Sequence, residues 1–215
     1  MPVTIDAFFK PKSAPATSQM NPSPVAKTPE PKASSEQEAD KEQDFIDFFV
    51  KIAKNPDFRG KKMNSRRVAV FGEPYYWGND VTFSIDKLPL SFRKWCAHYK
   101  YTGHNSFLIN VYEDKKDNIG WHCDDVSNLA DGKVISISFA IKKQDRGKVL
   151  SHFEFRWPHK NSDSTTVKSE KLTHGTVIRF DAKKHKKKRC EHRVSKTLVP
   201  RLNITMRKLG RTPTK

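Results

Sequence analysis

Three side chains in the second half of the sequence have the types and the spacing of a metal-binding site. His122 and Asp124 are separated by one residue, which places their side chains on one face of an extended strand. We take His192 as the third ligand, because its rival His185 lies in the basic tract 183–189, where positive charge opposes metal binding. Two imidazoles and one carboxylate on one face suit Fe(II) and leave coordination positions open for other ligands.

A second group of polar side chains alternates along residues 201–207. One face of this segment carries two guanidiniums, an amide and a hydroxyl, namely Arg201, Asn203, Thr205 and Arg207. The other face is apolar and suits a core, with Leu202, Ile204 and Met206. A small dicarboxylate would balance two buried guanidiniums, since arginine binds a carboxylate through two parallel hydrogen bonds. A solvated sheet edge is the alternative. Asn110 and Tyr112 alternate in the same way shortly before His122.

The order of these motifs resembles that of the AlkB family of Fe(II)- and 2-oxoglutarate-dependent dioxygenases, which demethylate nucleic-acid bases. The matching motifs, in chain order, are Asn110-x-Tyr112, His122-x-Asp124, His192 and Arg201-x-Asn203-x-Thr205-x-Arg207. The resemblance covers about residues 56–209, and the last motif is its most specific part. It implies a double-stranded β-helix (jelly-roll) dioxygenase core, Fe(II) as the metal and 2-oxoglutarate as the cosubstrate.

The resemblance also implies a role for each residue of these motifs. The implied iron ligands and catalytic residues are His122, Asp124 and His192. Arg201 pairs with the distal carboxylate of 2-oxoglutarate, and Tyr112 bonds to the same group. The residues implied to surround the metal-bound end or line the same pocket are Asn110, Asn203, Thr205 and Arg207. The implied reaction uses O2 to convert 2-oxoglutarate to succinate and CO2, and it releases an N-methyl group as formaldehyde.

Residues ahead of the iron motif resemble the nucleotide-recognition lid of AlkB homologues that act on duplex DNA. This likeness rests on residues 66–73 and 81–84. It implies that Phe83 stacks on a flipped base opposite His122 and that Phe58 fills the vacated stack, since base extraction needs an aromatic pocket and a plug. The implied substrate contacts are Phe58, Phe71, Tyr76, Trp77 and Phe83. Phe71 and Phe83 could equally be core residues.

One position departs from the family pattern. Val126 stands two residues after Asp124, where family members often have an acidic residue that reads the base edge. The adjacent Asp125 would point elsewhere on an extended backbone. N1-methyladenine and N3-methylcytosine suit such an enzyme, because the methyl group blocks pairing and makes flipping less costly. The preferred lesion, the strandedness of the substrate and the choice between DNA and RNA stay open.

Composition excludes several other classes of protein. The 215 residues include 41 Lys or Arg and 24 Asp or Glu, and the net charge of +17 favours a polyanionic partner such as nucleic acid. No apolar run approaches the roughly 20 residues of a membrane span, and no secretory signal is visible at the N-terminus. Three well-separated cysteines form neither a disulfide framework nor a zinc site, so we expect a reducing intracellular compartment.

Alternating and β-branched segments predict a mainly β fold with flanking helices. The predicted strands are 107–112, 134–140, 152–157, 176–181 and 202–206. The predicted helices are 44–54 and 89–99. Short strands with few helices favour a sandwich or jelly roll that has its helices on one side.

The chain divides into three predicted parts. Residues 13–43 are a predicted disordered linker, because they lack Phe, Tyr, Trp, Leu and Ile and cannot bury enough apolar surface. Residues 44–215 are the predicted dioxygenase domain. Residues 1–12 carry an apolar plug that resembles the clamp-binding peptide of replication and repair proteins. The plug consists of Ile5, Phe8 and Phe9.

Together these features predict a nuclear, monomeric DNA-repair enzyme that demethylates N-alkylated bases and is tethered to a sliding clamp. The basic tract 183–189 is predicted to bind backbone phosphates, and it resembles a nuclear import signal. Two alternatives stay open: the same chemistry on methylated RNA, and a catalytically inactive nucleic-acid-binding module. The clamp-like peptide argues against the first, and the complete iron motif with both arginines argues against the second.

Overall fold

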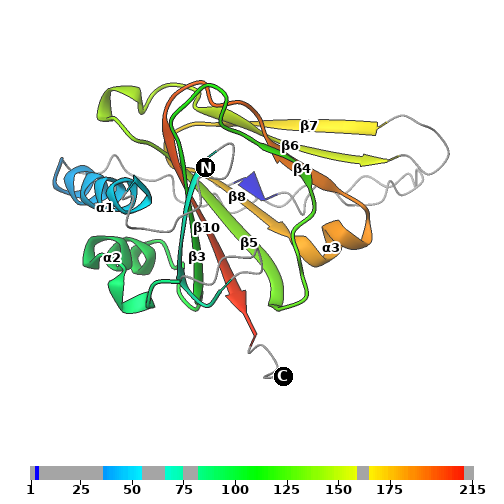
Figure 1. Cartoon of the computed structure of the whole chain (residues 1–215), viewed down its shortest axis with the longest axis horizontal. Helices are drawn as coiled ribbons and strands as arrows, with labels where there is room; N and C mark the ends of the chain where they lie inside the picture. Colours follow the sequence, from blue (N-terminus) through cyan, green and yellow to red (C-terminus); the bar gives the residue numbers. More distant parts are fainter. Residues whose placement is uncertain (1–2, 5–35, 55–65, 75–81, 159–164, 211–215) are drawn as a thin grey trace, which may run out of the picture.

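The computed structural model describes residues 3–4, 36–54, 66–74, 82–158 and 165–210. Two sheets built from these residues face each other (Figure 1). The major sheet contains, in spatial order, β1 (Val3–Thr4), β8 (Thr176–Asp181), β5 (Leu129–Ala140), β10 (Arg201–Leu209), β3 (Ser106–Tyr112) and β2 (Arg67–Gly72). The minor sheet contains β4 (Ile119–His122), β9 (Glu191–Val194), β6 (Ser151–Pro158) and β7 (Thr165–Leu172). This arrangement confirms the predicted jelly-roll core.

Helices α1 (Glu36–Lys54) and α2 (Leu90–His98) cover the outer face of the major sheet, away from the minor sheet (Figure 1). Phe45 and Phe49 of α1 are one helical turn apart and fully buried. Their rings contact Phe92 of α2 edge-on, at 5.3 and 5.1 Å between centroids. This aromatic layer forms the first hydrophobic core with the strands beneath it. Among the described helices, none combines the length and the apolar character that a membrane span requires.

The first helix corrects one predicted boundary. It begins at Glu36 rather than near Asp44, so residues 36–43 of the predicted linker are helical. Two long-range contacts hold these polar turns: Glu42 Oε1 lies 2.7 Å from His174 Nε2, and the Gln43 side chain donates to the Ile141 carbonyl at 2.9 Å. Tertiary contacts therefore stabilise a helical segment that lacks a large apolar side chain of its own.

Strand β10 lies in the middle of the major sheet, between β3 and β5. Leu202, Ile204 and Met206 face the helices and are fully buried. The polar side chains of residues 201–207 face the minor sheet. Asn203 is paired with Asn110 of β3 on one side and with Ser138 of β5 on the other. Because a shift by one residue would exchange the two faces, this pairing fixes which side chains point into the space between the sheets.

All five predicted strands and the second predicted helix are confirmed, and β5 extends further than predicted. The sequence did not predict β2, β4, β7 and β9, which are short or carry many charges. It also did not predict that the basic tract begins as helix α3 (Ala182–Lys187), whose first turn is capped by Asp181 accepting from the Lys184 backbone N–H at 2.9 Å.

Candidate active site

The predicted iron ligands come together between the two sheets. His122 at the end of β4 is paired with His192 of β9, and Asp124 follows β4 directly. The Nε2 atom of each histidine lies 3.9 Å from Asp124 Oδ1, and one possible ligand atom from each residue lies within 4.8 Å of the others. The rival His185 is instead buried in α3, where its ring stacks on Phe180 at 5.0 Å.

Hydrogen bonds and burial orient the three side chains for metal binding. The His122 Nδ1–H donates to the Gly120 carbonyl at 2.8 Å, which leaves Nε2 as the nitrogen with a lone pair for the metal. Burial lowers the pKa of His192 to about 3, so its imidazole is neutral. Burial works against the charged form of Asp124, but the positive charge and hydrogen bond of Arg207 outweigh it and hold the pKa of this carboxyl below its usual value. Arg207 also donates to Asp124 Oδ2 at 3.1 Å.

Arg201 is a buried arginine on the same face of β10 as Arg207. Its side chain is fully buried and lies over the Tyr112 ring, with 3.7 Å between the guanidinium carbon and the ring centroid. Burial lowers the pKa of Arg201, yet an arginine stays charged inside a protein. Within the described residues, none of its three guanidinium nitrogens has a hydrogen-bond partner, and neither has the Tyr112 hydroxyl. These buried donors fit the carboxylate of 2-oxoglutarate, which would satisfy them.

A hydrogen-bond network connects β3, β5 and β10 along the polar face of β10. The Asn203 amide donates to Ser136 Oγ at 2.8 Å and to the Ile137 carbonyl at 2.9 Å. Its carbonyl oxygen accepts from Thr205 Oγ1 at 3.0 Å and from the Asn110 amide at 3.4 Å. The network holds both amides in one orientation, so the predicted pocket residues are fixed before any ligand binds.

Arg66 also belongs to this site, although the sequence motifs assigned it to the nucleotide-recognition lid. It is buried, and its Nε donates to the Asn110 carbonyl oxygen at 2.8 Å. Its position follows from the pairing of Val68 with Asn110, which puts residue 66 on the polar face of the sheet. Only the register between β2 and β3 could have revealed this contact, and no local motif encodes it.

The predicted substrate contacts differ in where the structure places them. Phe71 is fully buried in the first core against Phe49, so it offers no surface to a base and we assign it to the core. Phe83 is half-buried and stacks on Phe71, at 4.7 Å between centroids. Val126 packs against the second core, which lies between the sheets. The predicted residues that lie outside the described part of the chain are Ile5, Phe8, Phe9, Phe58, Tyr76 and Trp77.

Comparisons with known proteins agree with this geometry. The profile of the 2OG-Fe(II) oxygenase superfamily matches residues 38–207. Mouse alpha-ketoglutarate-dependent dioxygenase alkB homolog 3 is 32% identical over 155 residues, or 66% of this chain and 51% of the mouse protein. Its human counterpart is 35% identical over 117 residues, or 49% of this chain and 37% of that protein. Bovine DNA oxidative demethylase ALKBH2 is 31% identical over 164 residues, or 66% of this chain and 57% of that protein.

The superfamily match covers most of the chain, which therefore belongs to the 2-oxoglutarate- and Fe(II)-dependent oxygenases. Its similarity to the alkB homologues places it in the AlkB family, as the motifs implied. The protein is thus a dioxygenase, with Fe(II) as its metal and 2-oxoglutarate as its cosubstrate. The chain spans about half the length of the curated relatives it matches.

Proposed function

We propose that this protein removes alkyl groups from N-alkylated bases in DNA, with N1-methyladenine and N3-methylcytosine as substrates, and so repairs DNA by direct reversal. The observation that carries the proposal is the His-Asp-His cluster together with the buried, unpaired Arg201 on the same face of β10 as Arg207. The similarity to a relative named as a DNA oxidative demethylase adds the substrate class. The strong net positive charge supports a polyanionic substrate.

The residues of this chain divide the task of positioning. When bound, iron and 2-oxoglutarate use O2 to oxidise the N-methyl group, which leaves as formaldehyde while 2-oxoglutarate becomes succinate and CO2. Arg201 anchors the cosubstrate through its distal carboxylate. Arg207 keeps Asp124 ionised and aligned through the 3.1 Å hydrogen bond. We assign the contact with the flipped base to Phe83, which is half-buried and stacks on Phe71 at the edge of the first core.

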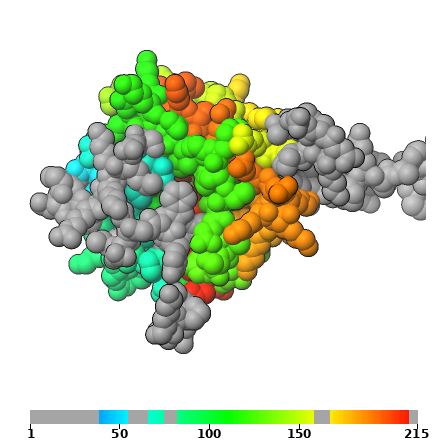
Figure 2. Space-filling view, turned by 45° about the vertical axis from the view of Figure 1, so that its right-hand side comes forward, coloured from blue at the N-terminus to red at the C-terminus, as the bar shows by residue number. Residues whose placement is uncertain are grey.

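Helix α3 is the proposed contact with the nucleic-acid backbone. Four of its lysines are exposed: Lys183, Lys184, Lys186 and Lys187. Figure 2 shows this segment, in orange, on the molecular surface. The chain continues from α3 through exposed Arg189 into β9, which carries His192, so the positive surface lies close in sequence to the iron ligands. Phosphates bound there would hold a strand near the active site without reading its sequence.

Formaldehyde release tests the reaction directly. The substrates are oligonucleotides that carry N1-methyladenine or N3-methylcytosine, as single-stranded DNA, duplex DNA and RNA, each with Fe(II), 2-oxoglutarate and O2. We expect release from DNA and none with Asp124→Ala, which lacks an iron ligand. Release from RNA alone would replace DNA with RNA as the substrate. Succinate formed without formaldehyde would retain the oxygenase and reject the proposed substrates.

The role of α3 has its own test. Lys186→Glu combined with Lys187→Glu should weaken binding to unmodified DNA and reduce the dependence of log affinity on log salt by about 2. The matched control is Lys171→Glu, an exposed lysine on β7, which should leave both quantities unchanged. Equal effects of the control and the double variant would reject α3 as the specific contact.

We further propose that residues 5–9 bind a sliding clamp. The proposal rests on the sequence pattern of Ile5, Phe8 and Phe9, which lie outside the described residues. The double variant Phe8→Ala and Phe9→Ala should abolish clamp capture by the full chain and leave demethylation of free oligonucleotides unchanged. Undiminished capture would reject the peptide as the anchor.

We also propose that the enzyme acts in the nucleus as a monomer. The basic tract 183–189 supports nuclear import, since dense clusters of lysine and arginine are typical of import signals. Fluorescence microscopy of the tagged chain should show nuclear signal, and sedimentation should give a mass near 24.8 kDa. Cytoplasmic signal would reject the first proposal, and a mass twice as large would reject the second.

A further inference from the structure

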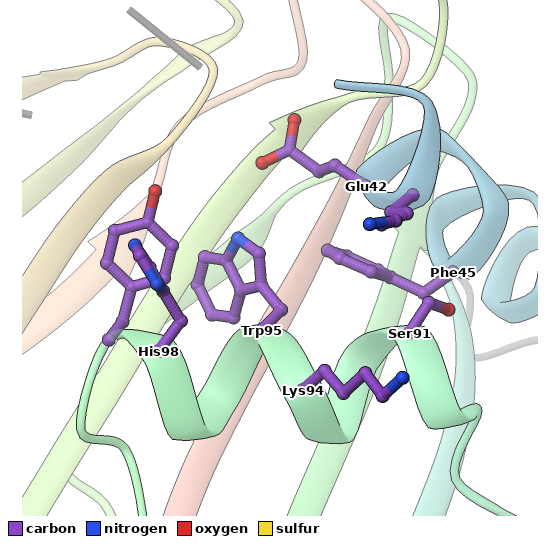
Figure 3. Close-up of a pocket in the computed structure, with 8 residues that line it drawn as sticks. Glu42, Phe45, Ser91, Lys94, Trp95 and His98 are labelled. Carbon is purple, nitrogen blue, oxygen red and sulfur yellow. The ribbon is translucent and has the colours of Figure 1, made fainter. Parts of the chain in front are cut away.

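A cavity of about 270 Å³ opens between α1 and α2, on the side of the major sheet away from the iron ligands (Figure 3). Its volume is close to the lower end of small-molecule sites, about 300–1,000 Å³. Strand β10 separates the two sites, because its apolar face packs beneath the helices while Arg207 on its other face contacts Asp124. A ligand in the cavity would therefore touch neither iron nor 2-oxoglutarate.

One wall of this cavity is aromatic. The rings of Trp95 and Tyr99 lie 4.7 Å apart, and the His98 ring meets Tyr99 nearly edge-on at 4.8 Å. Tyr99 keeps 42% of its surface exposed. Figure 3 shows the indole nitrogen of Trp95 directed away from the α2 backbone. A flat ring can stack on this wall, and the indole N–H can donate to an acceptor on that ring.

Three charged side chains also line the cavity. Lys41 of α1 and Lys94 of α2 line it, and both are exposed. Glu42 lines it as well, and its carboxylate is held by His174, a residue that does not line the cavity. The Ala140 backbone N–H donates to His174 Nδ1, so the His174 proton sits on Nε2 and is donated to Glu42 Oε1. A carboxylate held in this way through one oxygen can accept a hydrogen bond from a ligand at the other.

We propose that this cavity binds one nucleotide. Its base stacks on Trp95 and Tyr99, and its phosphate lies between Lys41 and Lys94. Aromatic surfaces bordered by cationic side chains are the common means of binding single-stranded nucleic acid. Glu42 adds base preference, because a carboxylate accepts from the exocyclic amino group of a base such as cytosine or adenine, whereas thymine has no amino group and only its ring N3–H to donate. An acidic peptide would also suit the lysines, but it would leave the aromatic wall without a flat ring to stack on.

Binding and photo-cross-linking test the proposal with the full chain. Calorimetric titrations would use dAMP, dCMP, dTMP and an unmethylated single-stranded oligonucleotide, and 8-azidoadenosine monophosphate would map the contact by mass spectrometry. Lys94→Glu should weaken binding about tenfold or more, the effect of losing one charged contact. The matched control is Arg93→Glu, the exposed neighbour on α2 that does not line the cavity.

Each outcome decides the proposal. Cross-links on residues 91–99 that disappear in Lys94→Glu but persist in Arg93→Glu and in Asp124→Ala would support it, whether or not the protein demethylates DNA. Binding of mononucleotides would identify a free nucleotide as the ligand, whereas binding of the oligonucleotide alone would identify a nucleotide within a strand. Cross-links confined to the surroundings of Phe83 and His122, equal losses in both charge variants, or no saturable binding would overturn it.

Discussion

On one face of β10, Leu202, Ile204 and Met206 are fully buried against the helices, and on the other face Arg201 and Arg207 are buried almost as completely. Burial of the apolar face stabilises the fold by itself, at about 25 cal/mol for each Å² removed from water. Burial of a guanidinium is unfavourable unless hydrogen bonds and an opposite charge compensate it. One strand thus carries both the centre of the core and the floor of the active site.

The two arginines of the polar face also differ from each other. Arg207 donates to Asp124 within the protein, whereas Arg201 has only the Tyr112 ring beneath it among the described residues. The difference agrees with the roles proposed above, in which Arg207 supports a ligand of the metal and Arg201 binds the cosubstrate. Similarly buried side chains on β10 therefore contribute in three different ways: the apolar residues stabilise the core, Arg207 holds Asp124, and Arg201 is an uncompensated charge. Substitutions along β10 can distinguish these contributions.

The largest expected effect is that of Arg201→Met, which removes the buried charge and keeps the bulk. The loss of one partner of a buried ion pair costs about 3–5 kcal/mol, so the KM for 2-oxoglutarate should rise at least about 100-fold. Without cosubstrate the variant should be as stable as the parent or more stable, by up to about 4 kcal/mol, because an uncompensated charge is gone. Urea unfolding with and without 2-oxoglutarate, beside succinate kinetics, measures both.

Lys208→Met is the matched control, since Lys208 is exposed on the same strand. It should change neither the KM nor the stability of the cosubstrate-free protein. A cosubstrate-free Arg201→Met protein that is clearly less stable than the parent would contradict the view that Arg201 is uncompensated.

Next in size is Ile204→Ala on the apolar face. The fully buried isoleucine lies in the first core, so its truncation should lower the free energy of unfolding by about 2–5 kcal/mol. The KM for 2-oxoglutarate, measured well below the unfolding temperature, should stay within about twofold of the parent, as expected when distant groups act independently. A large rise in KM would mean that the two faces of β10 are coupled.

Arg207→Met should have a smaller effect, on the metal. It removes the hydrogen bond to Asp124 Oδ2 but none of the ligands. Loss of such a supporting contact typically lowers metal affinity about 10- to 100-fold. Competition with a chelator measures the iron affinity, and Arg201→Met serves as the comparison because it should leave that affinity nearly unchanged. The reverse ranking of the two variants would exchange the roles assigned to the arginines.

Local sequence patterns were sufficient to predict features that depend on the side-chain periodicity of a single strand or helix. Alternation along residues 201–207 correctly assigned every side chain of that stretch to a face, and the one-residue spacing of His122 and Asp124 correctly indicated that their side chains lie together. The aromatic spacing in residues 45–49 likewise predicted the helix that covers the sheet. In each case the period of the side chains matches the period of the backbone.

Features that depend on pairing between distant segments could not be read in this way. The register of β2 against β3 places Arg66 on Asn110, and no local signal encodes it. The contact of Glu42 with His174 explains why α1 begins at Glu36. Phe71 looked like a candidate for stacking on a base, but the same aromatic ring serves equally well in a core, and only its burial distinguishes the two.

The smallest expected effect is that of Thr205→Val, and the sign of its change in stability is informative. Thr205 Oγ1 donates to Asn203 Oδ1 at 3.0 Å, while Ser136 and the Ile137 carbonyl hold the other end of that amide. The loss of one buried hydrogen bond should lower the stability of the cosubstrate-free protein by about 0.5–1.5 kcal/mol. This sign is opposite to that expected for Arg201→Met, although both residues lie on the polar face. Unfolding of the two variants side by side measures it, and a Thr205→Val protein more stable than the parent would show that the network is strained rather than satisfied.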